Sequence, residues 1–316
     1  MSSLTRNEAA QWLSEGDNFA ILTHRRPDGD TIGSAATLCR GLRQLGKTAH
    51  IIENSEITVK YAHLHENLTK KWVEAGDNVV SVDVASPNML SDSFQKLIGQ
   101  ITLRIDHHET ATSFTACELV EPDAAACAEI IYDLLMLMGV ELDKPMAEAL
   151  YTAVATDTGC FRYANTTAHS YRTAAACADT GADLNAITQA IFETNTFRRL
   201  KIQSWVTENA RFLANGQVAI AAIPLAVERE IGVNEDDMEN ISGFPRTIEG
   251  VKIAVTIREK ENGTVKASIR AVPGWDAAAI CAKFGGGGHK GAAGATMHMS
   301  LPEATEAIIA ALPEME

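Results

Sequence analysis

The sequence has no apolar run long enough to cross a bilayer, and its start, MSSLTRNEAAQWLSEGDN, is polar and acidic. That start lacks the apolar core of a secretory signal peptide, so neither export nor a membrane anchor is expected. The six cysteines form no C-x-x-C pair and lie scattered, mostly within apolar segments. This spacing argues against a disulfide framework and a cysteine zinc site, and it predicts buried thiols in a reducing cytoplasm.

Positive charge is also scarce. The chain has 27 lysine and arginine residues against 41 aspartate and glutamate residues, which gives a net charge of −14. The acidic excess is spread over both halves, so the sequence offers no broad basic face for long duplex nucleic acid. A polyanionic ligand can still bind where metal ions or a few arginines reverse the charge locally.

In other respects the composition is that of an ordinary folded protein, with 46% hydrophobic and 22% charged residues. A chain of 316 residues exceeds one compact core and predicts two domains. Short apolar strands alternate with helical stretches over the first two thirds, which predicts an α/β domain around a mostly parallel sheet. Further strands, two of them flanking the turn EKENG, indicate a smaller α+β domain with a hairpin.

These patterns predict three segments along the chain. Residues 1–186 form the first domain, and residues 217–316 form the second. The intervening residues 187–216 have a helical pattern that closes at Gly216, and we expect a helical connector there.

The strongest chemical signal is the segment THRRPDGDTIGS at residues 23–34. It follows a buried strand, opens a helix, and places His24, Asp28 and Asp30 within seven residues. A helix N-cap accounts for one such residue, either Asp30 or Thr31, but not for three potential ligands together. We expect these side chains at the carboxyl edge of the sheet, where ligands gather in α/β folds.

Three further segments carry the same residue types at the ends of elements. VSVDVAS ends a strand with Asp83, and TAVATDTG places Asp157 within an apolar helical pattern. LRIDHHET ends another strand with Asp106, His107 and His108. Each segment alone could be a helix cap or a satisfied buried polar group, although a lone charge in apolar surroundings needs a partner. Together they are expected to converge on one centre.

Six of these side chains are candidate metal ligands, namely His24, Asp28, Asp30, Asp83, His107 and Asp157. Aspartate and histidine without cysteine suit Mn(II), Mg(II) or Fe(II) better than structural zinc. Six ligands are too many for one ion that keeps an open position, but they fit two ions about 3.5–4 Å apart, as used in phosphoryl displacement. The four carboxylates then balance the charge of two divalent ions.

The motifs resemble the DHH phosphoesterase family in residue type, order and spacing. The shared elements are H-x-x-P-D-G-D-x-x-G-S, an Asp-ended strand, D-H-H and T-D-T-G. The later GGGGHKGAAG resembles the DHH-associated domain of RecJ-like proteins, so the resemblance covers essentially the whole chain. The length is similar to that of the short members, the nanoRNase and pAp phosphatase type, and leaves no room for added nucleic-acid-binding domains.

The resemblance implies a role for each metal ligand. His24 and Asp28 would hold one ion, and Asp83 would bridge both. The remaining ligands of the second ion would be Asp30, His107 and Asp157. A water activated by both ions, with Mn(II) as the first choice, would be the nucleophile. The catalytic set would be Asp83, His107, His108 and Asp157.

The resemblance also implies substrate contacts. His108 resembles the histidine that touches the substrate phosphate, and Asp106 would orient a neighbouring imidazole. The matching positions in the second domain are Arg270, Gly287, Gly288 and His289. Glycine backbone N–H groups can approach an anion closely, and we expect the residues after them to start a helix whose N-terminus favours phosphate. Arg258 is either a further phosphate contact or a solvated strand residue.

We therefore expect a cytoplasmic, metal-dependent phosphoesterase that acts on short oligonucleotides, pAp or linear dinucleotides, with no role for long duplexes or membranes. One alternative is a soluble inorganic pyrophosphatase, which shares the N-terminal pattern but would carry a Lys/Arg-rich anion site in its second domain. Another is a catalytically silent nucleotide-binding module, which a missing ligand would favour, and none is missing. The sequence leaves open a homodimer, the direction of degradation and the choice between RNA and DNA.

Overall fold

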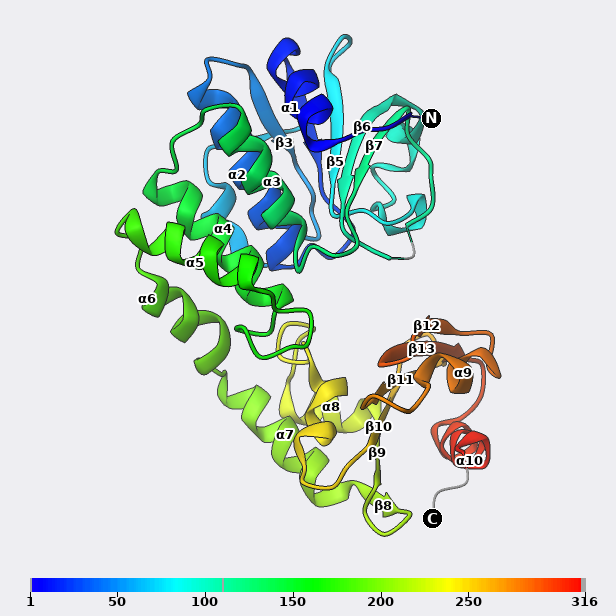
Figure 1. Cartoon of the computed structure of the whole chain (residues 1–316). Coiled ribbons are helices and arrows are strands. Elements are labelled where there is room, and N and C mark those ends of the chain that lie inside the picture. The colour runs from blue at the N-terminus through cyan, green and yellow to red at the C-terminus, as the bar shows by residue number, and fades with distance from the viewer. Residues whose placement is uncertain (1, 110, 314–316) are drawn as a thin grey trace. The chain divides into compact units, whose positions relative to one another are not determined.

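The computed structural model describes residues 2–109 and 111–313 (Figure 1). Their contacts divide the chain into two compact units, Met1–Thr194 and Asn195–Glu316. The division falls within the segment that the sequence assigns to a connector. In the part of the chain that is described, no helix combines the length and apolar character needed to span a bilayer.

The first unit is built around a sheet with the strand order β1-β7-β6-β5-β2-β3-β4. Every neighbouring pair among these described strands runs parallel. The strands are β1 (Ser2–Ser3), β2 (Phe19–Leu22), β3 (Ala49–Ile52), β4 (Thr69–Lys70), β5 (Asn78–Val82), β6 (Ile101–Asp106) and β7 (Cys117–Val120). The predicted α/β fold with a mostly parallel sheet is therefore confirmed.

Helices and helical turns cover this sheet. The α-helices are α1 (Arg6–Glu15), α2 (Gly29–Gln44), α3 (Cys127–Leu137), α4 (Lys144–Asp157), α5 (Ala168–Asp179) and α6 (Leu184–Thr188). The short turns are η1 (Val59–His65), η2 (Pro87–Met89), η3 (Gln95–Gln100) and the π-helical η4 (Gln189–Glu193). Figure 1 shows α2 and α3 side by side on one side of the sheet, and both helices contact each other.

Alternate residues of β2 enter two separate apolar layers. Phe19 and Ile21 pack in the layer that α2 and α3 share, whereas Ala20 and Leu22 pack with buried residues of the segment 84–101. Both faces of the sheet are thus covered, which explains why its central strands are almost continuously apolar. Polar side chains can reach solvent mainly where the strands end.

Helices α2 and α4 approach each other closely at Gly33. A Cβ atom added there would lie 2.4 Å from the carbonyl oxygen of Ala149 and 2.7 Å from the Cβ of Ala153. Since the contacting atoms are backbone and Cβ atoms, they cannot move aside without shifting the helix. The absence of a side chain at Gly33 therefore sets the spacing of α2 and α4.

Replacing Gly33 with alanine is expected to lower the free energy of unfolding by about 1–3 kcal/mol through overpacking. Urea denaturation with a matched control, Gly99→Ala, measures the effect, since a Cβ at Gly99 meets nothing within 4 Å. Equal stability of the two variants would show that the helices do not depend on this contact.

The second unit is built on a mixed sheet with the order β12-β13-β11-β10-β9-β8. Only β9 and β10 pair in parallel among the described strands of this sheet. The strands are β8 (Arg211–Leu213), β9 (Val218–Ile223), β10 (Ile253–Glu259), β11 (Val265–Ala271), β12 (Gly287–His289) and β13 (Ala292–Met297). The predicted hairpin around EKENG is present as β10 and β11.

The helices of this unit are α7 (Phe197–Asn209), α8 (Leu225–Ile231), α9 (Ala277–Ala282), α10 (Leu301–Ala311) and the 3-10 turn η5 (Ile241–Thr247). Its main apolar cluster joins residues of β10, β11 and β13 to residues of α9 and α10. The unit has its own core, as expected of an α+β domain.

Two local predictions are wrong. The helical pattern does not run to Gly216, because α7 ends at Asn209 and β8 then pairs antiparallel with β9. The residues after the glycine run do not start a helix either, because β13 pairs with both β11 and β12. In both places main-chain pairing between strands outweighs the local helical pattern.

Candidate metal centre

The segment between β2 and α2 folds around Asp28. Its Oδ1 accepts hydrogen bonds from the backbone N–H of Asp30 at 3.0 Å and of Thr31 at 3.2 Å. Asp28 is therefore the N-cap of α2, where the sequence pattern had suggested Asp30 or Thr31. This cap begins α2 one residue before Asp30, which is completely buried.

Asp30 joins α2 to the start of α3. Its Oδ1 accepts hydrogen bonds from Ser34 Oγ and from the backbone N–H of Ala128, both at 3.0 Å. Its Oδ2 accepts a 2.7 Å bond from the backbone N–H of Cys127. A carboxylate at a helix N-terminus is favoured by the helix dipole. Asp30 is thus held rigidly, and it contributes to the fold as well as to the candidate centre.

Asp83 lies at the middle of the cluster. It follows β5 directly, has a left-handed φ of 59° and is only 3% exposed. Its buried Oδ1 has no hydrogen-bond partner among the described residues. His24 Nε2 lies 3.4 Å from Oδ2, and His107 Nε2 lies 3.5 Å from Oδ1. A buried carboxylate needs positive charge beside it, which the two imidazoles supply here and which a bound divalent cation would also supply.

The two imidazoles beside Asp83 are oriented by main-chain carbonyls. His24 Nδ1 lies 2.7 Å from the carbonyl oxygen of Arg25, and His107 Nδ1 lies 3.0 Å from that of Ala124. A carbonyl oxygen only accepts, so each Nδ1 carries the hydrogen. The Nε2 atoms therefore face the carboxylates, which is the arrangement of metal-binding histidines.

The candidate ligand atoms form three overlapping groups. The first group is His24, Asp28 and Asp83, the second is Asp30, His107 and Asp157, and the third is Asp83, His107 and His108. Within each group the ligand atoms lie within 4.8 Å of one another. Asp83 also reaches the second group through its contact with His107. All six side chains that the sequence proposed as metal ligands thus lie together at the carboxyl edge of the sheet.

The electrostatics of the cluster show a shortage of positive charge. Burial and the negative charge of Asp83 raise the pKa of Asp30 to about 7. Burial and the charge of Asp30 raise the pKa of Asp157 well above its ordinary value. Although burial opposes charging, the close contact with Asp83 and the charge of Asp30 raise the pKa of His107 to about 11. Asp30, Asp157 and His107 therefore hold protons that offset the negative charge of the cluster. Divalent cations would supply the same positive charge, so the site is suited to them.

His108 makes a separate contact with Asp106, the completely buried last residue of β6. Asp106 Oδ1 lies 2.8 Å from His108 Nδ1, and Arg104 Nη1 lies 3.8 Å from Asp106 Oδ2. Although burial opposes charging, the bond to Asp106 and the charge of Asp83 raise the pKa of His108. Because Nδ1 is engaged by the carboxylate, Nε2 is the atom that can donate to a ligand.

A left-handed turn follows Asp157 at the end of α4. Gly159, Cys160 and Phe161 have consecutive φ values of 56°, 57° and 61°. Asn165 then returns to the helix end, and its Nδ2 donates to the carbonyl oxygens of Asp157 at 3.2 Å and of Ala125 at 3.0 Å. The sequence pattern FRYANTT leaves open whether Asn165 lines the cleft or packs, and these bonds give it a packing role at the end of α4.

In the second unit, the pairing of the strands places Arg270 and His289 on either side of the same residue, Ala292. Ala292 of β13 pairs with Arg270 of β11 on one side and with His289 of β12 on the other. Residues paired laterally in this way lie on one face of a sheet, two strand spacings of about 4.8 Å apart. Gly287 and Gly288 precede His289 on the edge strand β12.

Arg258 of β10 has a different environment from the one the sequence suggested. Its Nε donates to Glu228 Oε1 at 2.8 Å, and its Nη2 donates to Glu228 Oε2 at 3.0 Å. Glu235 lies 3.3 Å from the same guanidinium. The arginine is therefore neither a solvated strand residue nor free for phosphate, because two glutamates hold it.

Comparison with known proteins agrees with this geometry. Residues 18–154 match the DHH family, N-terminal domain, and residues 215–314 match the DHHA1 domain. A Thermus thermophilus protein named bifunctional oligoribonuclease and PAP phosphatase NrnA is 34% identical over 302 residues, which are 93% of this chain and 89% of that protein. The chain belongs to the DHH family.

Two solved structures share this DHH fold. An exopolyphosphatase-related protein from Bacteroides fragilis superposes with a TM-score of 0.87 at 22% identity, covering 97% of this chain and 94% of that one. The exonuclease RecJ bound to manganese gives a TM-score of 0.57 at 14% identity, covering 99% and 96% of the two chains.

Proposed function

We propose that this DHH protein is a metal-dependent phosphoesterase that hydrolyses very short oligonucleotides to nucleoside monophosphates and pAp to AMP. The observation that carries the proposal is the buried carboxylate of Asp83, which lies 3.4 Å from His24 Nε2 in one ligand group and 3.5 Å from His107 Nε2 in the other. The name of the Thermus thermophilus relative supports the substrate class. The glycine–histidine strand β12 favours a nucleotide over pyrophosphate.

The residues present fit two divalent cations. His24 and Asp28 would hold one, and Asp83 would contact both. The further ligands of the other would be Asp30, His107 and Asp157. When bound, such cations acidify water and offset the charge of a phosphoryl group. Manganese is our choice of ion because aspartate and histidine suit it and because the RecJ structure contains it.

His108 is proposed to bind the scissile phosphate. Asp106 holds its Nδ1, so the charged imidazole presents the Nε2–H to a non-bridging phosphate oxygen. This donor stabilises the negative charge that develops as water attacks phosphorus and the P–O bond breaks. The products are a monophosphate and an alcohol, and no covalent enzyme intermediate forms.

The second unit is proposed to hold another phosphate of the substrate. The Arg270 guanidinium can pair with phosphate through two parallel hydrogen bonds, and His289 on the same face can add a further donor. The backbone N–H groups of Gly287 and Gly288 would be further donors to the same phosphate. A requirement for a second phosphate would select nucleotides such as pAp and linear dinucleotides.

The cytoplasm is the proposed compartment. All six cysteines are free thiols, and Cys39, Cys127, Cys177 and Cys281 are buried. Thiols that pack as small apolar side chains are compatible with a reducing environment.

The direct test is hydrolysis by the full-length protein in the presence of Mn(II). With pApA as substrate we expect AMP, and with pAp we expect AMP and inorganic phosphate, both followed by chromatography. Failure to hydrolyse either compound while manganese is bound would overturn the proposal. Faster phosphate release from pyrophosphate than from either nucleotide would make the protein a pyrophosphatase instead.

Manganese is also expected to stabilise the fold, because it binds the assembled cluster and not the unfolded chain. At a hundredfold excess over its Kd the gain is about 2.7 kcal/mol. Calorimetry should show a rise in Tm of several degrees for the wild type and a much smaller rise for Asp157→Asn. An equal rise in both proteins would place the bound ion elsewhere.

A further inference from the structure

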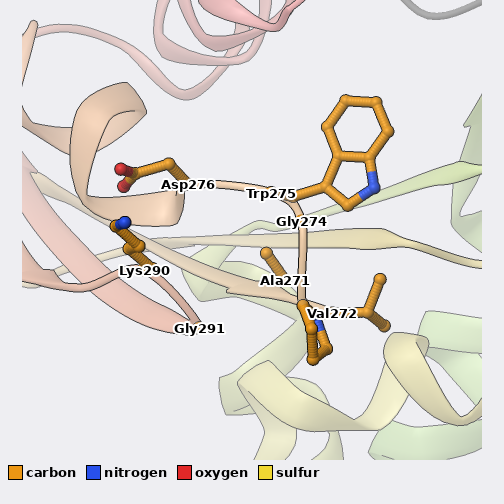
Figure 2. Close-up of a pocket in the computed structure, with 8 residues that line it drawn as sticks. Ala271, Val272, Gly274, Trp275, Asp276, Lys290 and Gly291 are labelled. Carbon is orange, nitrogen blue, oxygen red and sulfur yellow. The ribbon is translucent and has the colours of Figure 1, made fainter.

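A cavity of about 500 Å³ lies in the second unit beside the glycine–histidine strand (Figure 2). Its lining comes from residues 271–276, which begin at the last residue of β11, and from Lys290 and Gly291, which follow β12. None of these residues has a place in the function proposed above. The volume lies within the range of about 300–1,000 Å³ that is typical of small-molecule sites.

A tight turn fixes the aromatic wall of this cavity. The backbone N–H of Trp275 donates to the carbonyl oxygen of Val272 at 3.2 Å. Pro273 occupies the second position of this turn, and Gly274 occupies the third with a φ of +97°. Proline followed by glycine with positive φ is the pattern of a type II turn. The backbone of Trp275 is therefore set before any ligand binds.

Main-chain hydrogen bonds join the cavity to the glycine–histidine strand. The N–H of Ala277 donates to the carbonyl oxygen of Lys290 at 2.7 Å, and the N–H of Ala271 donates to that of Gly291 at 2.9 Å. Lys290 directly follows His289. The cavity and the glycine–histidine strand are therefore built from adjoining residues of the chain.

Trp275 has the properties of a stacking surface. The indole is half-buried: part of it packs against the apolar core of the unit, and part lines the cavity. The ammonium of Lys252 lies 6.0 Å from the ring centroid, which favours a defined ring orientation. An indole held in this way offers a flat π surface of the kind on which nucleic-acid bases stack.

The polar groups of the cavity are suited to a phosphorylated ligand. Asp276 Oδ1 caps α9 by accepting a hydrogen bond from the N–H of Ala279 at 2.9 Å. This bond fixes the Asp276 side of the cavity. Within the described residues, Lys290 makes no side-chain ion pair, which leaves its ammonium available to an anion. In Figure 2 the side chains of Asp276 and Lys290 lie on the other side of the view from the Trp275 ring. An aromatic surface and a cation therefore occupy different parts of one cavity.

We propose that this cavity is a nucleobase subsite, in which a base of the substrate stacks on Trp275 while Lys290 lies beside the attached phosphate. The inference rests on the proposed function and deepens it, because it assigns recognition of the base to a residue outside the phosphate-binding set. Stacking is tolerant of sequence, since every base has a π-face. The subsite would favour nucleotides over phosphoesters that lack a base, and it would discriminate only weakly among the bases.

The test compares pAp with ribose 3′,5′-bisphosphate, which carries the same phosphates without a base. Wild-type kcat/KM should be at least about fivefold higher for pAp, the lower limit of stacking on one aromatic side chain. Trp275→Leu, which keeps an apolar group against the core, should remove most of this preference and leave the rate with ribose bisphosphate unchanged. Trp275→Phe should retain most of the preference.

A matched control is Trp72→Leu, since Trp72 is 66% exposed in the first unit and should have no influence on the preference. The inference is overturned if Trp275→Leu keeps the preference for pAp, or if it lowers both rates equally.

A binding measurement separates this inference from the proposed function. If the wild type hydrolyses neither compound, the function fails, but calorimetric titration with AMP still tests the cavity. Trp275→Leu should weaken AMP binding at least about fivefold, and Trp275→Phe should weaken it less. Equal AMP affinity in the wild type and Trp275→Leu would overturn the inference.

Discussion

Replacing Asp83 with asparagine is expected to lower kcat for dinucleotide hydrolysis by about a thousandfold or more, a rise of roughly 4 kcal/mol in the barrier. The carboxylate of Asp83 reaches both ligand groups, through His24 on one side and His107 on the other. An amide has similar size but lacks the charge and one of the two acceptor atoms. The loss should appear in kcat at saturating substrate and manganese.

A matched control for this variant is Asp92→Asn. Asp92 is 95% exposed and pairs only with Arg25 among the described residues, at 3.1 Å. Its replacement should leave kcat within about twofold of the wild type, because an exposed ion pair contributes little. If Asp83→Asn turned over within tenfold of the wild type with manganese bound, Asp83 could not be the residue that joins the two groups.

The second large effect is expected at His108. Its replacement by alanine should lower kcat by about 100-fold, the lower limit for removing one donor to a developing negative charge. His63→Ala is the control, since that histidine is exposed on η1. Metal content should be unchanged in both variants. A His108→Ala enzyme with wild-type kcat would exclude the histidine from phosphate binding.

The variant Asp106→Asn tests the role of His108 through the pH dependence of kcat, because Asp106 contacts the His108 imidazole. The wild-type contact raises the pKa of His108, so the charged imidazole that donates to phosphate persists to a higher pH than in an ordinary histidine. Without the carboxylate the pKa falls. Activity that depends on the charged form should then be lost at lower pH in Asp106→Asn than in the wild type. An unchanged upper limb of the pH–kcat profile would contradict this role for Asp106.

The convergence of the site was predictable because parallel strands place their carboxyl ends along one edge. Strands β2, β5 and β6 are neighbours in the sheet, and they end next to His24, Asp83 and His107. Sequence motifs gave the residue types, and the sheet topology supplied the proximity. The same argument could not predict that Asp30 also accepts hydrogen bonds from the first turn of α3. Its partners there, Cys127 and Ala128, lie 97 and 98 residues away in the sequence.

The second unit was harder to predict because its decisive interactions are non-local. The pairing of β13 with β11 and β12 depends on main-chain groups, which leave no trace in hydrophobic periodicity. Arg258 looked equivalent to Arg270 because both lie on hairpin strands, and only the fold brings Glu228 within 2.8 Å of Arg258. Trp275 follows a Pro-Gly turn that carries no catalytic motif, so its place in one cavity with Lys290 became visible only in three dimensions.

Titration of the chelator-treated protein with Mn(II), with AMP release from pApA followed in the same samples, tests the central claim most directly. We expect about two manganese ions per chain, with turnover absent at the start and complete only when both are bound. Full turnover without added metal, or with a single ion per chain, would contradict the account.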